Sequence, residues 1–236
     1  MGDLGKIFIG IVAFLASLLS VSYIMDSRAL AEKEDYKNRL LSELSVVSNE
    51  ELADIEIIRS DLQDCLKAVD SIIEDMADGR RSKDKKQLAE DYLLVSQKMY
   101  ISFFPQSGSY EQLINSGSLE LIESANFRKV LLDTYTHLPD RNDALSRTLD
   151  DYYLVLTEAF GKYVTIIPSE MKTRSFVYSN TKVKYFSVDD SFYRSKKHLS
   201  VLIETRNLIS KYLNLLDRFS ESYGRLVVHA KEELNS

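Results

Sequence analysis

The chain has 236 residues, enough for one or two domains with a sizeable core. Gly (8 of 236 residues) and Pro (3 of 236) are both scarce, since average usages are about 7% and 5%. This scarcity argues against a turn-rich β-sandwich or barrel and predicts a mainly helical protein. A single Cys excludes a disulfide framework and a multi-cysteine zinc site. The net charge of −6 argues against a general nucleic-acid-binding protein, so we expect no nucleic-acid partner.

The first feature in chain order is an apolar run. Ile7 to Met25 is 19 residues without a charge, bounded by Lys6 and Asp26. As a helix it would be about 28 Å long, close to the hydrocarbon thickness of a bilayer. A signal peptide is the alternative, because Ala29-Leu30-Ala31 offers a small-x-small cleavage site, but the run exceeds the roughly 7–15 apolar residues usual there. We therefore expect an uncleaved membrane anchor over residues 1–26.

Small residues recur at helical spacing within this run. Ala13 is followed by Ser17, and Ala16 by Ser20. Small residues four positions apart allow two membrane helices to approach closely, which makes this face a candidate for self-association. The positive charges do not settle which side of the membrane the body occupies, since the cations after the run are interleaved with acidic residues.

From Ser27 to Asp78 the chain contains neither Gly nor Pro, which predicts one long helix ended by Gly79. Apolar residues alternate spacings of three and four along it, as in a heptad seam: Ile55, Ile58, Leu62, Cys65, Val69, Ile72 and Met76. The same segment carries 6 basic and 14 acidic residues, so a parallel homodimer would bring like charges together. Two interpretations remain open, a coiled-coil dimer and an acidic helix packed within its own subunit. Cys65 is expected to be a buried, inert thiol, with an intersubunit disulfide as the alternative.

Shorter elements follow, and turn residues mark their ends. The expected elements are a helix over residues 83–103 stopped by Pro105, a short helix opened by a capping box of Ser109 and Gln112 and ended by a left-handed Gly117, a turn that begins at Ser118, and a helix that begins near Ala125.

The corner between these helices carries a resemblance. Its residues are Tyr36 and Leu40 in the long helix, then Tyr110, Leu113, Ser116, Gly117, Leu121 and Ile122, with Tyr135 further on. Over roughly the first 135 residues, this arrangement resembles a family of uncharacterised bacterial single-pass membrane proteins with an N-terminal anchor, a long charged helix and a Tyr-x-x-Leu-x-x-Ser-Gly helical corner. The resemblance implies a bacterial cytoplasmic (inner) membrane location with the body in the periplasm, a cytoplasmic body being the alternative. It implies a topology and no activity.

The C-terminal half predicts two helices separated by an irregular segment. The expected elements are a helix over Pro139–Phe160, a small hairpin of Phe176–Tyr178 with Val183–Phe186, and a long helix capped by Asp189 or Asp190 that runs to about Glu233. Packing the two longest helices antiparallel would return the C-terminus toward the membrane.

Residue patterns of known catalytic sites are absent from the sequence. It contains no GxGxxG, HExxH, DxDxDG or GxSxG motif. None of its three histidines has a partner at metal-ligand spacing, and its adjacent acidic pairs would point about 100° apart on a helix. We therefore predict a non-enzymatic protein with no cofactor and no metal.

The elements combine into an all-α protein: an N-terminal transmembrane helix (1–26), a long acidic, coiled-coil-like helix (27–79), a helical domain with a short-helix corner (80–160), an irregular segment or small β-hairpin (161–188) and a long C-terminal helix (189–236). The function this favours is a membrane-anchored scaffold or accessory subunit that acts through protein–protein contacts, as a homo-oligomer or with a partner membrane protein. The alternative is a ligand-binding sensor bundle that signals through a partner protein. The candidate oligomer seam comprises Ala13, Ser17, Ala16, Ser20, Ile55, Ile58, Leu62, Cys65, Val69, Ile72 and Met76.

Overall fold

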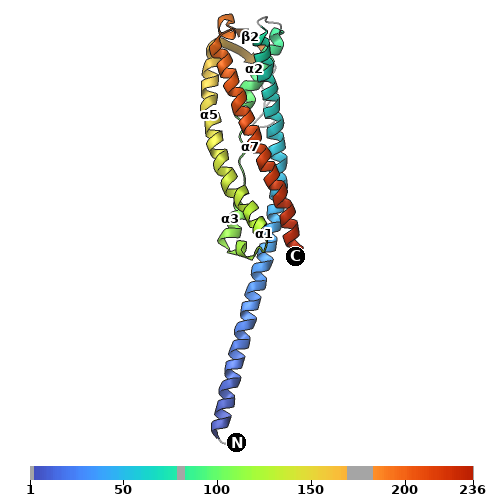
Figure 1. The fold of residues 1–236 in the computed structure, drawn as a ribbon, viewed down its shortest axis with the longest axis vertical. Coiled ribbons are helices and arrows are strands. Elements are labelled where there is room, and N and C mark those ends of the chain that lie inside the picture. Colours follow the sequence, from blue (N-terminus) through green and yellow to red (C-terminus); the bar gives the residue numbers. More distant parts are fainter. Residues whose placement is uncertain (1–2, 79–82, 169–182, 236) are drawn as a thin grey trace.

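The computed structural model describes residues 3–78, 83–168 and 183–235, with side chains described from Phe14 onward apart from those of Ala16 and Pro168. Figure 1 shows a long rod in which helix α1 (Asp3–Ala77) first runs alone and then enters a helical bundle. Helices α2 (Lys85–Lys98), α5 (Leu138–Tyr163) and α7 (Lys196–Leu234) complete the bundle. The all-α fold with one small hairpin is confirmed.

Helix α1 continues without a break past residue 26, so the expected anchor and the expected acidic helix form one continuous helix. Within the part of the chain whose side chains are described, no helix is long and apolar enough to cross a membrane. That part begins at Phe14, so residues 7–13 of the run Ile7–Met25 lie outside it. The expected helix end at Gly79 also lies outside the described residues.

Helices α1 and α7 pack antiparallel along the whole bundle, as expected. Three ion pairs between the two helices show this antiparallel direction. As the residue numbers of the α1 partners rise, those of the α7 partners fall. The pairs are Lys37 Nζ with Glu233 Oε1 (3.6 Å), Arg59 Nη2 with Asp217 Oδ1 (2.8 Å) and Asp70 Oδ1 with Arg206 Nε (2.6 Å). The C-terminus therefore returns to the level at which α1 leaves the bundle (Figure 1).

The heptad seam of α1 lies inside its own subunit. Ile55, Leu62, Cys65, Val69 and Ile72 are at most 1% exposed, and Ile58 and Met76 are half-buried against the same core. In the structure of the single chain these seven residues pack in the core of their own subunit, which is the second of the two interpretations left open by the sequence. The reason is that α7 and α2 supply apolar partners together with cations for the acidic face, as Lys98 does for Asp61.

Helix α2 ends at Lys98, five residues before the expected end, because tertiary hydrogen bonds engage the backbone of Phe103. The Phe103 N–H donates to Tyr212 Oη (2.6 Å), and the Phe103 carbonyl accepts from Asn142 Nδ2 (2.9 Å). Tyr212 Oη in turn donates to Asn142 Oδ1 (3.0 Å), which closes a buried ring of bonds. Residues 99–107 are thereby held as a non-helical segment against α5 and α7.

The corner at the base of the bundle consists of α3 (Gly108–Asn115), a 3₁₀ turn η1 (Ser118–Leu121) and α4 (Ala125–Leu132). Gly117 has φ 71°, which confirms the left-handed residue between α3 and η1. The expected capping box of Ser109 and Gln112 is wrong, since Ser107 precedes α3 and its Oγ donates to Glu111 Oε1 (2.5 Å).

At the distal end, strands β1 (Val164–Pro168) and β2 (Val183–Val188) form an antiparallel pair in which Ile166 lies opposite Phe186. The second strand was expected, whereas the expected first strand, Phe176–Tyr178, lies outside the described residues. Asp189 caps a four-residue helix α6 (Asp190–Tyr193), and Ser195 caps α7. The long C-terminal helix therefore begins at Lys196, later than the sequence predicts.

A buried histidine organises the aromatic residues at this end. His198 Nδ1 lies 3.0 Å from the carbonyl of Tyr193, which can only accept, so Nδ1 carries the proton and Nε2 accepts from Tyr92 Oη (2.8 Å). The rings of Tyr92, Phe160 and Phe192 surround the imidazole at centroid distances of 4.6–6.3 Å. Burial lowers the pKa of His198, so the neutral form is the one that the fold holds.

We expect the stability of the bundle to fall on acidification because of His198. With its pKa lowered in the folded state, the protein is stabilised above the unfolded value of about 6.5 and loses that contribution as pH falls through the folded value. Thermal melting of the full chain in mild detergent should therefore show a pH slope between about pH 7 and pH 5 that His198→Phe reduces. Tyr92→Phe, which removes one hydrogen bond, should cost about 1 kcal/mol. Equal slopes for the parent and His198→Phe would contradict this role.

We expect Gly117→Val to lower the free energy of unfolding by about 1–2 kcal/mol, because a β-branched residue resists the left-handed conformation. A Cβ at Gly117 would meet nothing within 4 Å, so the cost is that of the backbone alone. Gly117→Asn should cost less, since Asn tolerates this conformation. Gly108→Ala is the matched control, as Gly108 also has open space but no positive φ. A Gly117→Val protein that melts like Gly108→Ala would refute the interpretation.

Candidate functional site

The helix that rises from the corner contains an irregular turn. Helix α4 passes through a π-helical turn, η2 (Asp133–His137), into α5. Two residues account for the wider turn. Thr134 Oγ1 donates to the carbonyl of Val130 (2.7 Å), and Pro139 has no N–H while its ring crowds the carbonyl four residues earlier. Single π-helical turns are frequent at functional sites.

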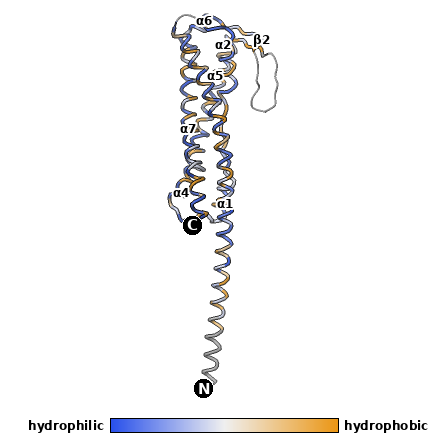
Figure 2. The backbone as a smooth tube through the Cα atoms, turned by 90° about the vertical axis from the view of Figure 1, so that its right-hand side faces the viewer, coloured by the Kyte–Doolittle hydropathy of each residue, from blue (hydrophilic) through white to orange (hydrophobic). Residues whose placement is uncertain are grey.

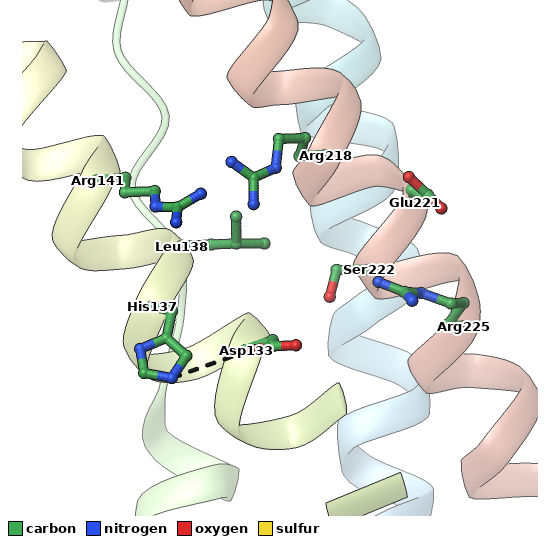
Figure 3. A pocket seen from close by; sticks show the side chains of 8 residues that line it. All are labelled: Asp133, His137, Leu138, Arg141, Arg218, Glu221, Ser222 and Arg225. Carbon is green, nitrogen blue, oxygen red and sulfur yellow. Dashed lines mark ion pairs between the residues drawn. The ribbon is translucent and has the colours of Figure 1, made fainter. Parts of the chain in front are cut away.

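A pocket of about 160 Å³ opens between this turn and α7 (Figure 3). Its lining residues are Asp133, His137, Leu138 and Arg141 from η2 and α5, and Arg218, Glu221, Ser222 and Arg225 from α7. The base of the pocket is fixed by a buried hydrogen bond between the hydroxyls of Thr134 and Ser222 (2.7 Å). This bond ties the π turn to α7, so the two walls of the pocket are held at a defined separation.

Three arginines dominate the lining, and we call them the arginine cluster: Arg141, Arg218 and Arg225. Arg218 and Arg225 are two helical turns apart on one face of α7, and Arg141 faces them from α5. In Figure 3 the guanidinium groups of Arg141 and Arg218 point toward one another, and that of Arg225 extends toward Ser222. All three side chains are exposed, and within the described part of the chain none has an ion pair or hydrogen bond.

The carboxylates of the pocket do not neutralise the arginine cluster. Asp133 Oδ1 lies 3.9 Å from His137 Nε2, one turn along the same helix. Glu221 is exposed and forms no ion pair within the described residues. The pocket therefore carries an excess of positive charge in a chain whose net charge is −6.

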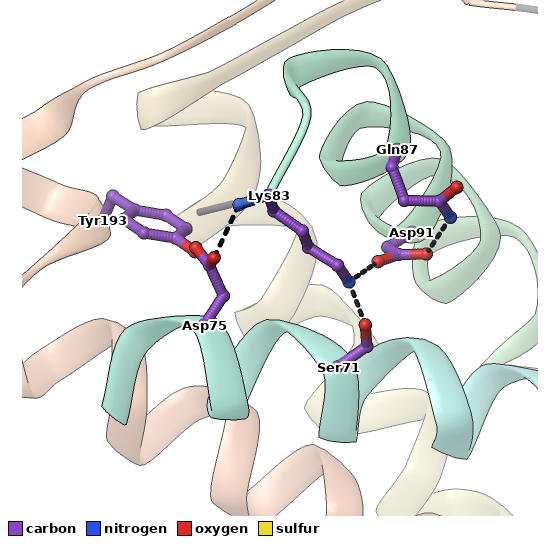
Figure 4. A network of polar contacts seen from close by, with 6 residues as sticks. All are labelled: Ser71, Asp75, Lys83, Gln87, Asp91 and Tyr193. Carbon is purple, nitrogen blue, oxygen red and sulfur yellow. Dashed lines mark hydrogen bonds and ion pairs between the residues drawn. The ribbon is translucent and has the colours of Figure 1, made fainter. Parts of the chain in front are cut away.

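A second polar cluster lies at the distal end and is structural (Figure 4). Lys83 Nζ pairs with Asp91 Oδ2 and contacts Ser71 Oγ, while the Lys83 N–H donates to Asp75 Oδ1 (2.8 Å). Tyr193 Oη donates to Asp75 Oδ2, and Gln87 Nε2 donates to Asp91 Oδ1 (3.0 Å). All four carboxylate oxygens are engaged, so this cluster joins α1, α2 and α6 and leaves no free group for chemistry.

Two further titratable groups are buried in the core without forming a reactive site. Burial raises the pKa of the Cys65 thiol to about 12, which makes it the inert thiol expected from the sequence. Burial also raises the pKa of Glu51, whose Oε1 accepts a hydrogen bond from the N–H of Gln106 (3.0 Å). Across the described residues, no group of three or more His, Cys, Asp or Glu side chains could hold a metal ion.

The structure does not bring the sequence-predicted candidate residues together. Ser17 and Ser20 lie exposed on α1 below the bundle, and Ser17 Oγ donates to the carbonyl of Phe14 (2.7 Å). The side chains of Ala13 and Ala16 lie outside the described residues. In the corner, Tyr110, Leu113 and Ile122 are buried, while Ser116, Leu121 and the backbone of Gly117 shape the turn. These corner residues serve packing and contribute no reactive group.

The arginine cluster is the feature that sequence reasoning missed. Arg141 precedes Arg218 by 77 residues, so nothing in the sequence pairs them. A seven-residue spacing places Arg218 and Arg225 on one helical face, which was the one available signal.

Comparison with known proteins leaves the function to be argued from this geometry. No protein-family model matches the chain, and no curated protein or solved structure matches it.

Proposed function

We propose that the protein is a membrane-anchored, non-enzymatic scaffold or accessory subunit whose helical body acts through protein–protein contacts. The observation that carries the proposal is the surface of α1 below the bundle. Large apolar side chains there are about half exposed or more: Phe14, Leu15, Leu18, Leu19, Val21, Tyr23, Ile24 and Met25.

These side chains cover the helix on every side. Figure 2 shows the apolar character of this described stretch, which contrasts with the polar part of α1 that follows it. A helix that is apolar all round belongs in a protein core or in lipid, and this stretch protrudes from its own core. The uncharged run from Ile7 to Met25 has the length that a bilayer requires, which supports a single-pass anchor.

The continuity of α1 supports a scaffold. The same helix that carries the proposed anchor forms the core of the body, so the body is held at a fixed position relative to the membrane. About 52 residues of helix follow Met25 in α1, which would place the distal end roughly 78 Å from the anchor. The proposed location is the bacterial inner membrane, with a periplasmic body favoured by the family resemblance and a cytoplasmic body as the alternative.

Contacts with a partner would use the outside of the bundle, since the seam of α1 is occupied. Exposed apolar side chains on the described surface include Phe104 (80%), Leu154 (66%) and Val155 (52%). The small-residue faces of the anchor remain a second route to a homo-oligomer.

A second candidate function is a ligand-binding sensor that signals through a partner protein. The observation that favours it is the arginine cluster, whose charges have no partner among the described residues. Solubility alone does not require three arginines without partners around one pocket, so the cluster favours a role in binding.

We expect the full chain to stay with the membrane through carbonate extraction. Leu15→Arg combined with Leu19→Arg should release it, because each arginine near the middle of a membrane helix costs about 2.5–3.5 kcal/mol. Val46→Arg is the matched control, since Val46 is exposed on the same helix beside the bundle and should leave extraction unchanged. A parent protein in the soluble fraction, or an N-terminus that begins at Glu32, would contradict the anchor.

We expect mild detergent to retain either a second copy or a stoichiometric partner protein. The mass of the purified complex, measured by light scattering, decides between a homo-oligomer and a hetero-complex. A monomer without any partner, in a preparation with the helical circular dichroism spectrum of the folded protein, would speak against the scaffold function.

A further inference from the structure

We propose that the pocket between η2 and α7 binds a small soluble anion that carries two or three negative charges on phosphate or carboxylate groups. The inference builds on the second candidate function, and it names the class of ligand. It does not depend on membrane attachment, because every residue that carries it belongs to the bundle.

The first argument is the unbalanced charge of the arginine cluster. The third arginine of α7, Arg206, is paired with Asp70 of α1. On α1, Arg59 is matched in the same way by Asp217. In the pocket, by contrast, the guanidinium groups of Arg141 and Arg218 point toward each other with no described carboxylate paired to either (Figure 3). An anion between them would replace repulsion with attraction.

The second argument is the geometry of the donors. A guanidinium group presents a planar fork of N–H donors that matches carboxylate and phosphate oxygens. Here the forks come from two helices, Arg141 from α5 and the other two from α7, so they approach a ligand from both sides. Three cationic donors around about 160 Å³ fit a compact ion with more than one negative charge better than a single carboxylate.

The acidic residues of the pocket restrict the ligand further. The carboxylate of Asp133 lies on the side of the pocket that faces Ser222 and α7 (Figure 3). A carboxylate can only accept hydrogen bonds, so it would repel a bare anion and accept from a hydroxyl group. The pocket therefore favours an anion that also carries a hydroxyl group, such as a hydroxy-carboxylate or a hydrogen phosphate.

The position of the pocket along the rod favours an anion from solution over the headgroup of a lipid. Tyr135 lies in the same π turn. Burial and the nearby carboxylate of Glu51 both raise the pKa of the Tyr135 hydroxyl, which places this turn beside that part of α1. Glu51 follows Met25 by 26 residues, which is about 39 Å of helix. The headgroups of a bilayer that holds residues 7–25 would lie too far away to reach the arginine cluster.

The test is isothermal titration of the full chain in mild detergent with citrate and with inorganic phosphate, at constant ionic strength and with acetate for comparison. We expect citrate or phosphate to bind at least about tenfold more tightly than acetate. Arg141→Gln combined with Arg218→Gln should weaken binding by about tenfold or more. Arg147→Gln, a matched change on α5 outside the pocket, should stay within about twofold of the parent.

Glu221→Gln provides a change in the opposite direction. It removes a negative charge from the lining and should strengthen binding, an effect that damage to the fold would not produce. Thermal melting without ligand checks folding, and the double arginine variant should melt no lower than the parent because a repulsive pair is removed.

Three results would overturn the proposal: no binding of citrate or phosphate up to about 10 mM, equal affinity in the double arginine variant, or an equal loss in Arg147→Gln. These results are separable from the fate of the anchor. A chain that is released by carbonate but binds citrate through the arginine cluster would refute the membrane proposal and leave this one standing.

Discussion

The antiparallel packing of α1 on α7 is the constraint on which the rest of the structure depends. Helix α1 presents an apolar stripe that it cannot bury alone, and α7 offers a matching one, with Leu208, Leu216 and Phe219 at most 3% exposed. Ion pairs from Lys37–Glu233 at one end to Asp70–Arg206 at the other fix the register of the two helices. Once that register is set, the shorter elements have defined surfaces on which to pack.

The acidic character of α1 is compatible with this packing because the other elements supply charge of the opposite sign. Lys98 of α2 pairs with Asp61, and Arg206 of α7 pairs with Asp70. The same stripe in a parallel homodimer would have met a second acidic helix with no such cations. Local charge therefore explains why the seam is used inside one subunit, although its heptad spacing alone is equally typical of a coiled coil.

Sequence periodicity predicted the long helices and the corner because both depend on local signals. The three-and-four spacing locates the buried side of α1, and Gly117 takes the left-handed conformation expected of it. Predictions failed where distant residues decide the local structure. The buried bonds of Phe103 to Tyr212 and Asn142 end α2 early. The described strand partner of Val183–Val188 is Val164–Pro168, in the segment that the sequence predicts to be irregular, and not the expected Phe176–Tyr178. The candidate site was missed for the same reason, since it exists only where α5 meets α7.

The arginine cluster lies between two helices that connect it to α1 and so to the rest of the rod. Its two walls are α5, which enters the bundle through a π turn, and α7, which packs along α1. The π turn interrupts the regular α-helix, and the hydroxyl pair of Thr134 and Ser222 holds this turn to α7. An anion that joined the arginines of both walls would strengthen that connection. Because α7 and α1 share one core and α1 continues into the proposed anchor, a ligand in the pocket and a membrane around that anchor would act on the same pair of helices. A scaffold that responds to a ligand needs such a junction, so the two candidate functions place compatible demands on this fold.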